Sequence, residues 1–386
     1  MKNKYNFLII GAGIGGLTTA IALQKAGYSV KVYESALKLL PLGAGIMLSG
    51  NAIKAYDEIG IASVIKAVGN EMSLARIQTS KGKLLSEIYM EAIKSQYGYA
   101  TYCFHRADLQ AALVGQLLPD TLVLGKKTMA FGQGEQGVTV NFSDTTSASG
   151  DYLIAADGVN SVIRNQLHPS VATRYSGYTC WRGICSFNEA DYNRSIMTES
   201  WGVGERMGVV PLTDDRVYWF MVKNAPAKSP SMSAYDKSSL SSLFSDWHYP
   251  IEKVLSATPE TGVLWNDIED IAPLKTWGKA RVTLLGDAAH ATTPNMGQGA
   301  CQAIEDAVFL VKSLEKYGLG EQALRHYESL RIPRTSKIIR QSWQLGKMGQ
   351  LSNPILRVLR NLVVRLTPKS VMLKQLRWLY DVNFEA

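Results

Sequence analysis

The chain has 386 residues, enough to bury a large core and to form two domains. The net charge of the chain is +8, but residues 331–386 alone hold eleven Lys or Arg against two acids, a net +9. The rest of the chain is close to neutral, so no basic groove for nucleic acid is expected. The four cysteines form no C-x-x-C pair, which argues against a redox dithiol, a disulfide framework and a metal site. No apolar run approaches the ~20 residues that cross a bilayer, which argues against a membrane-spanning helix.

The first strong pattern lies at the N-terminal end. Residues 7–10 form a short apolar run that predicts a buried strand, and the Gly-rich segment 11–16 follows at once. A helix with an apolar face is expected over 17–25, and a second strand over 30–33 ends at Glu34. Strand, G-x-G-x-x-G, helix, strand and acid together make the dinucleotide-binding pattern in its required context.

Each glycine of this pattern has its own physical task. Gly11 permits a tight turn, Gly13 lets the backbone approach a pyrophosphate, and Gly16 lets the helix lie close to the strand. The helix N-terminus then presents unpaired N–H groups to the phosphates. Because Glu34 can accept hydrogen bonds from a ribose diol, the pattern favours FAD or NAD over a cofactor with a 2′-phosphate.

The same spacing recurs at Gly132, Gly134 and Gly137. There it leads into an alternating strand over 138–142 and not into a helix, so we interpret it as a polar hairpin turn. The G-x-G-x-x-G spacing alone is therefore weak evidence for nucleotide binding, and the predicted elements around it decide the interpretation.

The next segments connect the fingerprint to later strands. The loop 39–46 contains Gly45, which could approach a flat ring closely or merely join two elements. A helix is expected over 51–59 and a hairpin over 74–90, inserted away from the nucleotide-binding part. Another helix is expected to begin near Arg106. The N–H groups of its guanidinium could bind a phosphate or form a surface salt bridge.

A second candidate for ligand binding follows a run of strands, which are expected over 121–124, 128–131, 138–142 and 152–156. The last strand ends in Asp157 and Gly158, at the carboxyl end of a buried strand where ligands of α/β folds collect. Ser161 and Arg164 follow one turn apart and can face the same way.

Residues 173–265 change character. Tryptophans and tyrosines alternate in strand patterns, which predicts an antiparallel sheet forming a second domain. Arg182 and Arg206 stand between apolar strand residues, and each needs a partner. An anionic or enolate-like ligand is one candidate partner, and a buried Glu or a backbone carbonyl is the other.

A nucleotide-type pattern returns near the end of the chain. A strand over 281–285 ends in Gly286 and Asp287, and a loop over 293–299 leads into a helix. His290 lies between them, where we expect a structural role. The nucleotide-binding part is therefore discontinuous.

The expected fold is α/β: a discontinuous Rossmann-like domain with a parallel sheet, an inserted, mostly antiparallel sheet domain for the substrate, and a C-terminal helical segment. The expected bounds are 1–73, 99–172 and 266–325 for the first domain, 74–98 and 173–265 for the second, and 326–386 for the C-terminal helices.

One C-terminal helix is strongly amphipathic. Ile355, Leu359, Leu362 and Leu366 form an apolar stripe on a basic helix that ends before Pro368. We expect this stripe to cover the body of the protein. Contact with an anionic membrane is the alternative.

Three motifs in this order resemble the single-component FAD-dependent aromatic hydroxylases. They are the N-terminal fingerprint with Glu34, the D-G-x-x-S-x-x-R run at 157–164, and the G-D run at 286–299. The stretches 175–178 and 293–299 are most similar to the salicylate and urate hydroxylase branch and to zeaxanthin epoxidase. The resemblance spans nearly the whole chain.

The resemblance implies a set of FAD-binding residues. Glu34 would bind the adenosine ribose, Arg106 the ribityl-pyrophosphate part, and Asp157 both FAD and the passing nicotinamide. Asp287 would bind the ribityl or pyrophosphate part, and residues 294–299 would lie along the isoalloxazine ring. The full set is Gly11, Gly13, Gly16, Glu34, Gly45, Arg106, Asp157, Gly286, Asp287, Gly297 and Gly299.

The resemblance also implies catalytic positions. Arg206 and Tyr218 stand at the spacing of a substrate-binding pair in the urate-type members, and Pro294 would lie beside the ring. Asn295 departs from the Asp of those members, which puts urate in doubt as the substrate. Ser35 stands where many relatives have Arg, so one adenine-side contact is expected to be missing.

The implied activity is that of a flavoprotein monooxygenase. NADPH or NADH reduces FAD, dioxygen adds to give a C4a-hydroperoxide, and an aromatic or other electron-rich small molecule is hydroxylated. The alternatives are an isoprenoid epoxidase, a hydroxylase that inactivates a polycyclic antibiotic, and a non-catalytic flavin-fold carrier. We expect a monomer or homodimer in the reducing cytoplasm, with no nucleic-acid partner.

Overall fold

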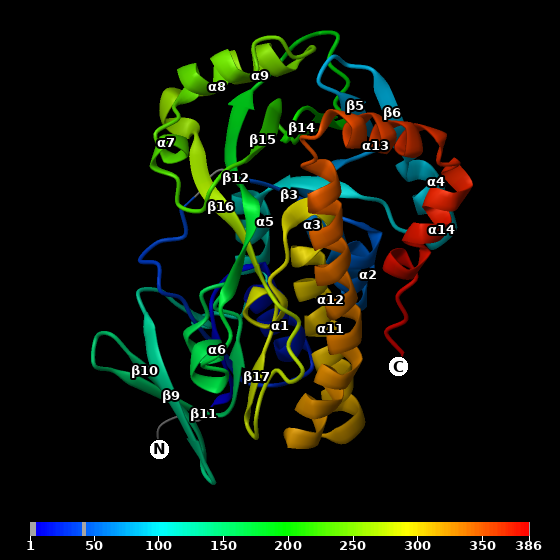
Figure 1. Cartoon of the computed structure of the whole chain (residues 1–386). Helices are drawn as coiled ribbons and strands as arrows, with labels where there is room; N and C mark the ends of the chain where they lie inside the picture. Colours follow the sequence, from blue (N-terminus) through cyan, green and yellow to red (C-terminus); the bar gives the residue numbers. More distant parts are fainter. Residues whose placement is uncertain (1–4, 41–43, 386) are drawn as a thin grey trace.

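The computed structural model describes residues 5–40 and 44–385. Residues 41–43, within the predicted loop 39–46, lie outside the described part. Two large sheets lie one above the other, and long helices run beside them (Figure 1). The α/β architecture expected from the sequence is confirmed.

The first sheet has a parallel centre. Its order is β8-β2-β1-β11-β10-β9, and β17 pairs with β11. The pairs β8–β2, β2–β1, β1–β11 and β11–β17 are parallel, whereas β9 and β10 join in antiparallel fashion. The strands are β1 (Tyr5–Ile10), β2 (Val30–Tyr33), β8 (Leu122–Val123), β9 (Thr128–Gly134), β10 (Gly137–Phe142), β11 (Ser147–Ala155) and β17 (Val282–Leu284).

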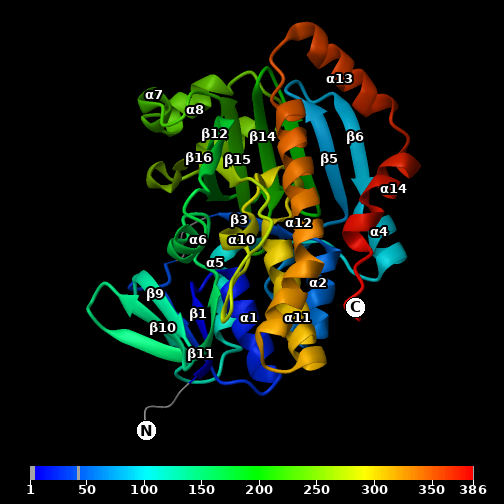
Figure 2. The ribbon, with the colours of Figure 1, turned by 60° about the horizontal axis from the view of Figure 1, so that its bottom comes forward.

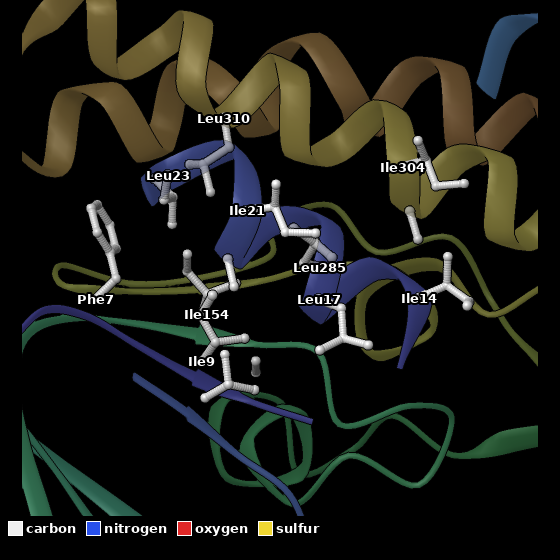
Figure 3. Packing of buried hydrophobic residues seen from close by; sticks show 14 of the residues in the cluster. Phe7, Ile9, Ile14, Leu17, Ile21, Leu23, Ile154, Leu285, Ile304 and Leu310 are labelled. Atoms are coloured by element: carbon white, nitrogen blue, oxygen red, sulfur yellow. The ribbon is translucent and has the colours of Figure 1, made fainter. Parts of the chain in front are cut away.

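The core of this layer forms where α1 (Ile14–Lys25) lies between the sheet and α11 (Gly299–Tyr317). Figure 3 shows Leu17 and Ile21 of α1 among Ile9, Ile154 and Ile304, all of them buried. Burial of each such aliphatic side chain stabilises the fold by about 1.5–3 kcal/mol. The sequence predicted this helix from residue 17, and it begins three residues earlier.

Two glycines permit this packing. Gly11 has a φ of +102°, which a side chain rarely allows. A Cβ on Gly16 would lie 2.0 Å from the carbonyl oxygen of Gly11, so only glycine lets α1 approach β1 this closely. Both tasks expected from the sequence are confirmed. The look-alike motif forms the predicted hairpin, with Gly134 paired to Gly137 between β9 and β10.

The second sheet has the order β16-β12-β15-β14-β13-β5-β6. All neighbours are antiparallel except β13 and β5. The strands are β5 (Leu74–Thr79), β6 (Leu84–Tyr89), β12 (Thr173–Ser186), β13 (Ile196–Trp201), β14 (Glu205–Pro211), β15 (Arg216–Asn224) and β16 (Leu264–Ile271). The predicted hairpin 74–90 thus joins this sheet, while the exact domain bounds stay a prediction.

Side chains of the second sheet alternate between two environments. One face packs Trp181, Trp219 and Met207 against short outer helices. These are α7 (Pro230–Ser233), α8 (Lys237–Leu243) and α9 (Ile251–Ala257). The other face, which carries Arg182 and Tyr218, looks toward the first layer.

A small third sheet was not predicted. It has the order β3-β7-β4 and consists of β3 (Gly45–Leu48), β4 (Asn70–Glu71) and β7 (Tyr102–His105). Its strands are too short for a clear alternating pattern, and Gly45 indicated a loop. The remaining short helices are α2 (Gly50–Glu58), α3 (Ala62–Ala67), α4 (Met90–Tyr97), α5 (Arg106–Val114), α6 (Val162–Leu167) and α10 (Asp287–His290), with the 3₁₀ turns η1 (Glu260–Gly262) and η2 (Pro294–Met296).

The C-terminal segment is helical, as expected. It comprises α12 (Glu321–Gly349), α13 (Pro354–Leu366) and α14 (Lys369–Tyr380). The prediction that the stripe of α13 covers the body of the protein is wrong, because its four members are exposed by 50% or more of their surface. The helix instead docks through Arg360, which is only 5% exposed. No helix in the described ranges is long and apolar enough to span a bilayer.

The close approach of α1 to β1 can be tested. Gly16→Ala should lower the free energy of unfolding by about 1–3 kcal/mol, because the backbone must shift to admit the methyl group. Gly132→Ala, in the look-alike motif, is the matched control, since a Cβ there meets nothing within 4 Å. Urea denaturation of both variants measures the difference, and equal stabilities would contradict this account of Gly16.

Candidate active site

A cavity of about 570 Å³ lies between the two layers. Its floor is formed where β1, β11 and β17 reach their carboxyl ends, at Gly13, Ala156 and Leu285. Its roof is the inner face of the second sheet. Ligands of parallel α/β sheets collect at this edge.

Most of the residues singled out from the sequence line this one cavity. They are Gly13, Gly16, Gly45, Arg106, Arg206, Tyr218, Gly286, Asp287, Pro294, Gly297 and Gly299. Gly11, Glu34 and Asp157 do not line it. Segments that are far apart in the sequence therefore meet at a single site, although the role of each residue stays a prediction.

Glu34 holds the Gly-rich loop from behind. Its Oε2 accepts a hydrogen bond from the backbone N–H of Ala12 at 2.8 Å, and its Oε1 accepts from that of Ala36 at 2.8 Å. The carboxylate thus fixes the loop to the end of β2. Binding of a ribose by Glu34 stays a prediction.

Asp157 lies at the start of α6 next to the cavity. Its Oδ2 accepts from the backbone N–H of Val162 at 2.9 Å, while its buried Oδ1 has no hydrogen-bond partner in the described part of the chain. Burial raises the pKa of this carboxyl. Ser161 caps α6, and the buried Arg164 donates to the carbonyl of Val159 at 2.6 Å, so both residues shape this turn.

These features fit a dinucleotide such as FAD. A Cβ on Gly13 or on Gly158 would meet nothing within 4 Å, so the backbone there is open to a bound group. The exposed Arg106 offers a cation to phosphate, and the unpartnered Oδ1 of Asp157 offers an acceptor. Asp287 lies exposed in the first turn of α10 and lines the cavity just beyond the end of β17, the strand that pairs with β11.

Gly45 is required by a close contact within the protein. A Cβ on Gly45 would lie 2.4 Å from the ring of Tyr218 in the second sheet, so a side chain does not fit there. The role of Gly45 in cofactor binding stays a prediction. Burial raises the pKa of Tyr218 far above its ordinary value, although Arg182 opposes the shift. Tyr218 therefore remains a protonated hydroxyl that can donate a hydrogen bond.

Arg206 is already engaged by protein groups. Its Nη1 donates to Oε1 of Glu199 at 3.0 Å, its Nη2 to Oδ1 of Asn295 at 2.8 Å, and its Nε to Oε1 of Gln350 at 2.8 Å. The sequence left a ligand and a buried Glu as alternatives for this arginine. The structure supplies Glu199, so the charge of Arg206 is neutralised within the protein.

Arg182 lies on the same face of the sheet without such a partner. Its side chain lines the cavity, and no carboxylate of the described residues pairs with it. On this side of the cavity, the positive charge that could pair with a ligand is therefore that of Arg182 and not that of Arg206.

A buried ionic cluster supports the loop between β17 and α11. Arg331 of α12 donates to Oδ1 of Asp306 at 2.7 Å and to Oε2 of Glu305 at 2.6 Å, and all three side chains are fully buried. The other oxygen of Asp306 accepts from the N–H of Gly286 at 3.0 Å and contacts Nε2 of His290 at 2.6 Å. His290 is thus structural in this arrangement, as expected.

The arginines outweigh the cost of burying these acids. Burial opposes ionisation of Glu305, yet Arg331 and Arg334 hold its pKa below the ordinary value. Burial likewise opposes ionisation of Asp306, and His290 and Arg331 lower its pKa. The sequence analysis missed this cluster, although two adjacent acids in an otherwise apolar helix were a visible signal.

Comparisons with known proteins agree with this geometry. Residues 4–342 match the model of a family described as FAD binding domain. The chain is 38% identical over 353 residues to the aurachin C monooxygenase/isomerase of Stigmatella aurantiaca, with 92% of each chain covered. It is 30% identical over 366 residues to the 2-heptyl-3-hydroxy-4(1H)-quinolone synthase of Pseudomonas aeruginosa (strain UCBPP-PA14), with 94% of each covered.

A solved structure is similar over almost the whole chain. The crystal structure of Klebsiella pneumoniae HpxO complexed with FAD and uric acid has a TM-score of 0.90 at 29% identity, and 97% of this chain and 96% of that chain are covered.

Breaking the ionic cluster should release the loop beside it. Arg331→Met leaves two buried acids with one fewer cation, which should lower the free energy of unfolding by about 3–5 kcal/mol. The exposed Arg340 on the same helix provides the matched control, Arg340→Met, which should stay within about 0.5 kcal/mol of wild type.

Denaturant titration and the flavin content of the purified protein measure these effects. If Arg331→Met does not yield soluble protein, Asp306→Asn tests the same contact with a milder change. Wild-type stability and full flavin content in both variants would show that the loop does not depend on the cluster.

Proposed function

The chain belongs to the FAD-binding-domain family and is an FAD-dependent monooxygenase with NAD(P)H as co-substrate, and from this premise we propose that it oxidises a planar nitrogen heteroaromatic with an ionisable ring oxygen and an apolar substituent. The resemblance to FAD-dependent hydroxylases inferred from the motifs is thereby confirmed. The substrate class rests on the cavity walls and on two relatives.

The relatives support a nitrogen heterocycle. One of them is named for an alkylated hydroxyquinolone, and the similar solved structure holds uric acid. Both named molecules combine a flat ring system that contains nitrogen with carbonyl or hydroxyl oxygens attached to the ring. Because Arg206 is paired with Glu199, it offers no free charge to an anionic substrate in this chain.

The free charge of Arg182 is the observation that carries the proposal. Four arginines line the cavity, and two of them are neutralised: Arg76 pairs with Glu87 at 2.8 Å, and Arg206 pairs with Glu199. Arg106 lies at the exposed end, where phosphate is expected. Arg182 is left to face the ionised oxygen of a bound ring.

An apolar wall next to Arg182 suits a substituent without charge. The wall continues along β5, β6, β13, β14 and β15 toward α14. Its side chains are Ala75, Ile77, Ile88, Met197, Val210 and Phe220. Burial of an alkyl group there is favourable by about 0.8 kcal/mol per methylene.

The residues of the chain would orient and activate the ring. When bound, FAD supplies reduction by NAD(P)H and the activation of dioxygen for oxygen transfer. Arg182 favours the ionised form of the ring oxygen, which enriches the ring in electrons, and the Tyr218 hydroxyl donates a hydrogen bond to the substrate.

The loop at 294–299 would complete the site. Pro294 opens the turn η2 along the cavity. The N-terminal N–H groups of α11, which begins at the cavity, would stabilise negative charge on a bound flavin. Arg206 would act indirectly, because it holds the side chains of Asn295 and Glu199 in place.

We also infer a location in a reducing compartment such as the cytoplasm. All four cysteines are buried and unpaired, which suits a cell interior that keeps thiols reduced.

Removal of the free cation should weaken substrate binding. Arg182→Gln should raise the KM for 2-heptyl-4(1H)-quinolone roughly ten- to hundredfold, because a hydrogen bond to a charged group is lost in a buried site. The flavin absorbance spectrum should not change. Arg76→Gln is the matched control, since its charge is already neutralised by Glu87, and its KM should stay near wild type.

Substrate-stimulated NAD(P)H oxidation measures both variants, and mass spectrometry of the product checks that oxygen is incorporated. An unchanged KM in Arg182→Gln together with a raised KM in Arg206→Gln would return Arg206 to the role of substrate partner. A rate that no phenol, quinolone or purine stimulates would contradict the proposed substrate class.

A further inference from the structure

Helix α13 is oriented with its polar side inward. The Nη1 of Arg360 donates to the carbonyl of Gly349 at 3.0 Å, and the guanidinium lies 4.7 Å from the ring centroid of Trp201. Asn361, next to it, accepts from the same arginine at 2.9 Å. The side that packs against the protein is therefore the polar side.

The outward side of α13 is almost entirely apolar. Ile355, Val358 and Leu366 are exposed by 78%, 70% and 69%. The full set of exposed apolar residues on α13 and the start of α14 is Ile355, Leu356, Val358, Leu359, Leu362, Val363, Leu366 and Val371. A surface helix normally buries such a stripe, and a continuous exposed patch of this kind marks an interaction surface.

The charges that α13 and α14 contribute to this patch have one sign. The sequence contains no Asp or Glu between residues 329 and 380. Arg365, Lys369 and Lys374 are exposed beside the apolar residues, and Arg377 has only a 3.4 Å contact with Asp381. The patch is thus apolar at its centre and cationic at its margin.

We propose that α13 and the start of α14 dock this enzyme on an anionic lipid surface. An in-plane helix with an apolar face and flanking cations is the structure that binds at the boundary between headgroups and acyl chains. Its 13 residues are too few to cross a bilayer but suffice to lie along one.

A second copy of the chain fits this patch less well. A two-fold interface places the same surface on both sides, so the basic margins of two copies would face each other without acids between them. Anionic headgroups supply the missing negative charge. Charge complementarity therefore favours lipid over self-association.

The position of the patch agrees with peripheral binding. Helix α13 lies at the outer edge of the second sheet, beside β6 and away from the first sheet (Figure 2). The exposure of its apolar residues shows that no element of the described chain covers them. A bilayer can approach this edge without contacting the Gly-rich loop or the N-terminal sheet.

Vesicle flotation of the purified holoenzyme tests the proposal. Wild type should float with vesicles of equal parts phosphatidylglycerol and phosphatidylcholine at low salt, and should stay in solution with pure phosphatidylcholine. The double variant Leu359→Gln/Leu362→Gln should reduce the floated fraction at least about tenfold, because it removes apolar contacts with the acyl region. Arg365→Gln/Lys369→Gln should reduce it on anionic vesicles in the same direction.

The matched control is Leu37→Gln/Leu118→Gln, two exposed leucines elsewhere on the surface, at 82% and 61% exposure. It should float like wild type. All variants should keep the wild-type flavin spectrum and substrate-independent NAD(P)H oxidation, since none of these residues lines the cavity. A loss of flavin would show misfolding, and the milder single variant Leu362→Gln then replaces the double one.

Three results would overturn the proposal. The first is that wild type fails to float with anionic vesicles, and the second is that the control loses flotation as much as the α13 variant does. Alternatively, sedimentation could show a dimer that Leu359→Gln/Leu362→Gln dissociates and that vesicles do not disrupt, in which case a second copy covers the patch. These readouts do not depend on the substrate, so they stand or fall separately from the proposed function.

Discussion

The pairing of Arg331 with Glu305 and Asp306 is the contact on which the cofactor side of the cavity depends. Two carboxylates in the middle of an apolar helix would be costly without a cation, and a single fully buried guanidinium serves both. The second carboxylate oxygen of Asp306 accepts a hydrogen bond from the N–H of Gly286 and contacts the ring of His290. One ionic contact thus sets the position of the loop that carries Asp287 and leads to residues 294–299.

The N-terminal half of the cavity was predictable because its information is local. Gly16 acts on the carbonyl oxygen of Gly11, five residues earlier, and the positive φ of Gly11 is a demand of its own backbone. Glu34 acts on the loop that precedes it. The look-alike motif at residues 132–137 could be set aside for the same reason, since an alternating strand follows it directly. Steric requirements between residues close in the sequence produce a recognisable motif, so they can be predicted from the sequence alone.

The opposite wall was less predictable because its chemistry depends on strand register. Arg182 and Arg206 look equivalent in the sequence, as arginines between apolar residues. Only the pairing of β13 with β14 brings Glu199 to Arg206, while no acid of the described chain reaches Arg182. Periodicity likewise revealed the stripe of α13 but not which way it faces, because the docking contacts of Arg360 come from residues outside that helix.

The cluster also reaches the end of the chain. Arg334 donates to both oxygens of Glu305 and, through its remaining N–H groups, to the carbonyls of Trp378 and Leu379 in α14. The last helix is therefore tied, through one side chain and a shared carboxylate, to the ionic cluster that supports the loop at residues 286–299. If a coenzyme bound at this loop strengthens these contacts, thermodynamic reciprocity requires that whatever steadies α14 strengthens coenzyme binding by the same free energy.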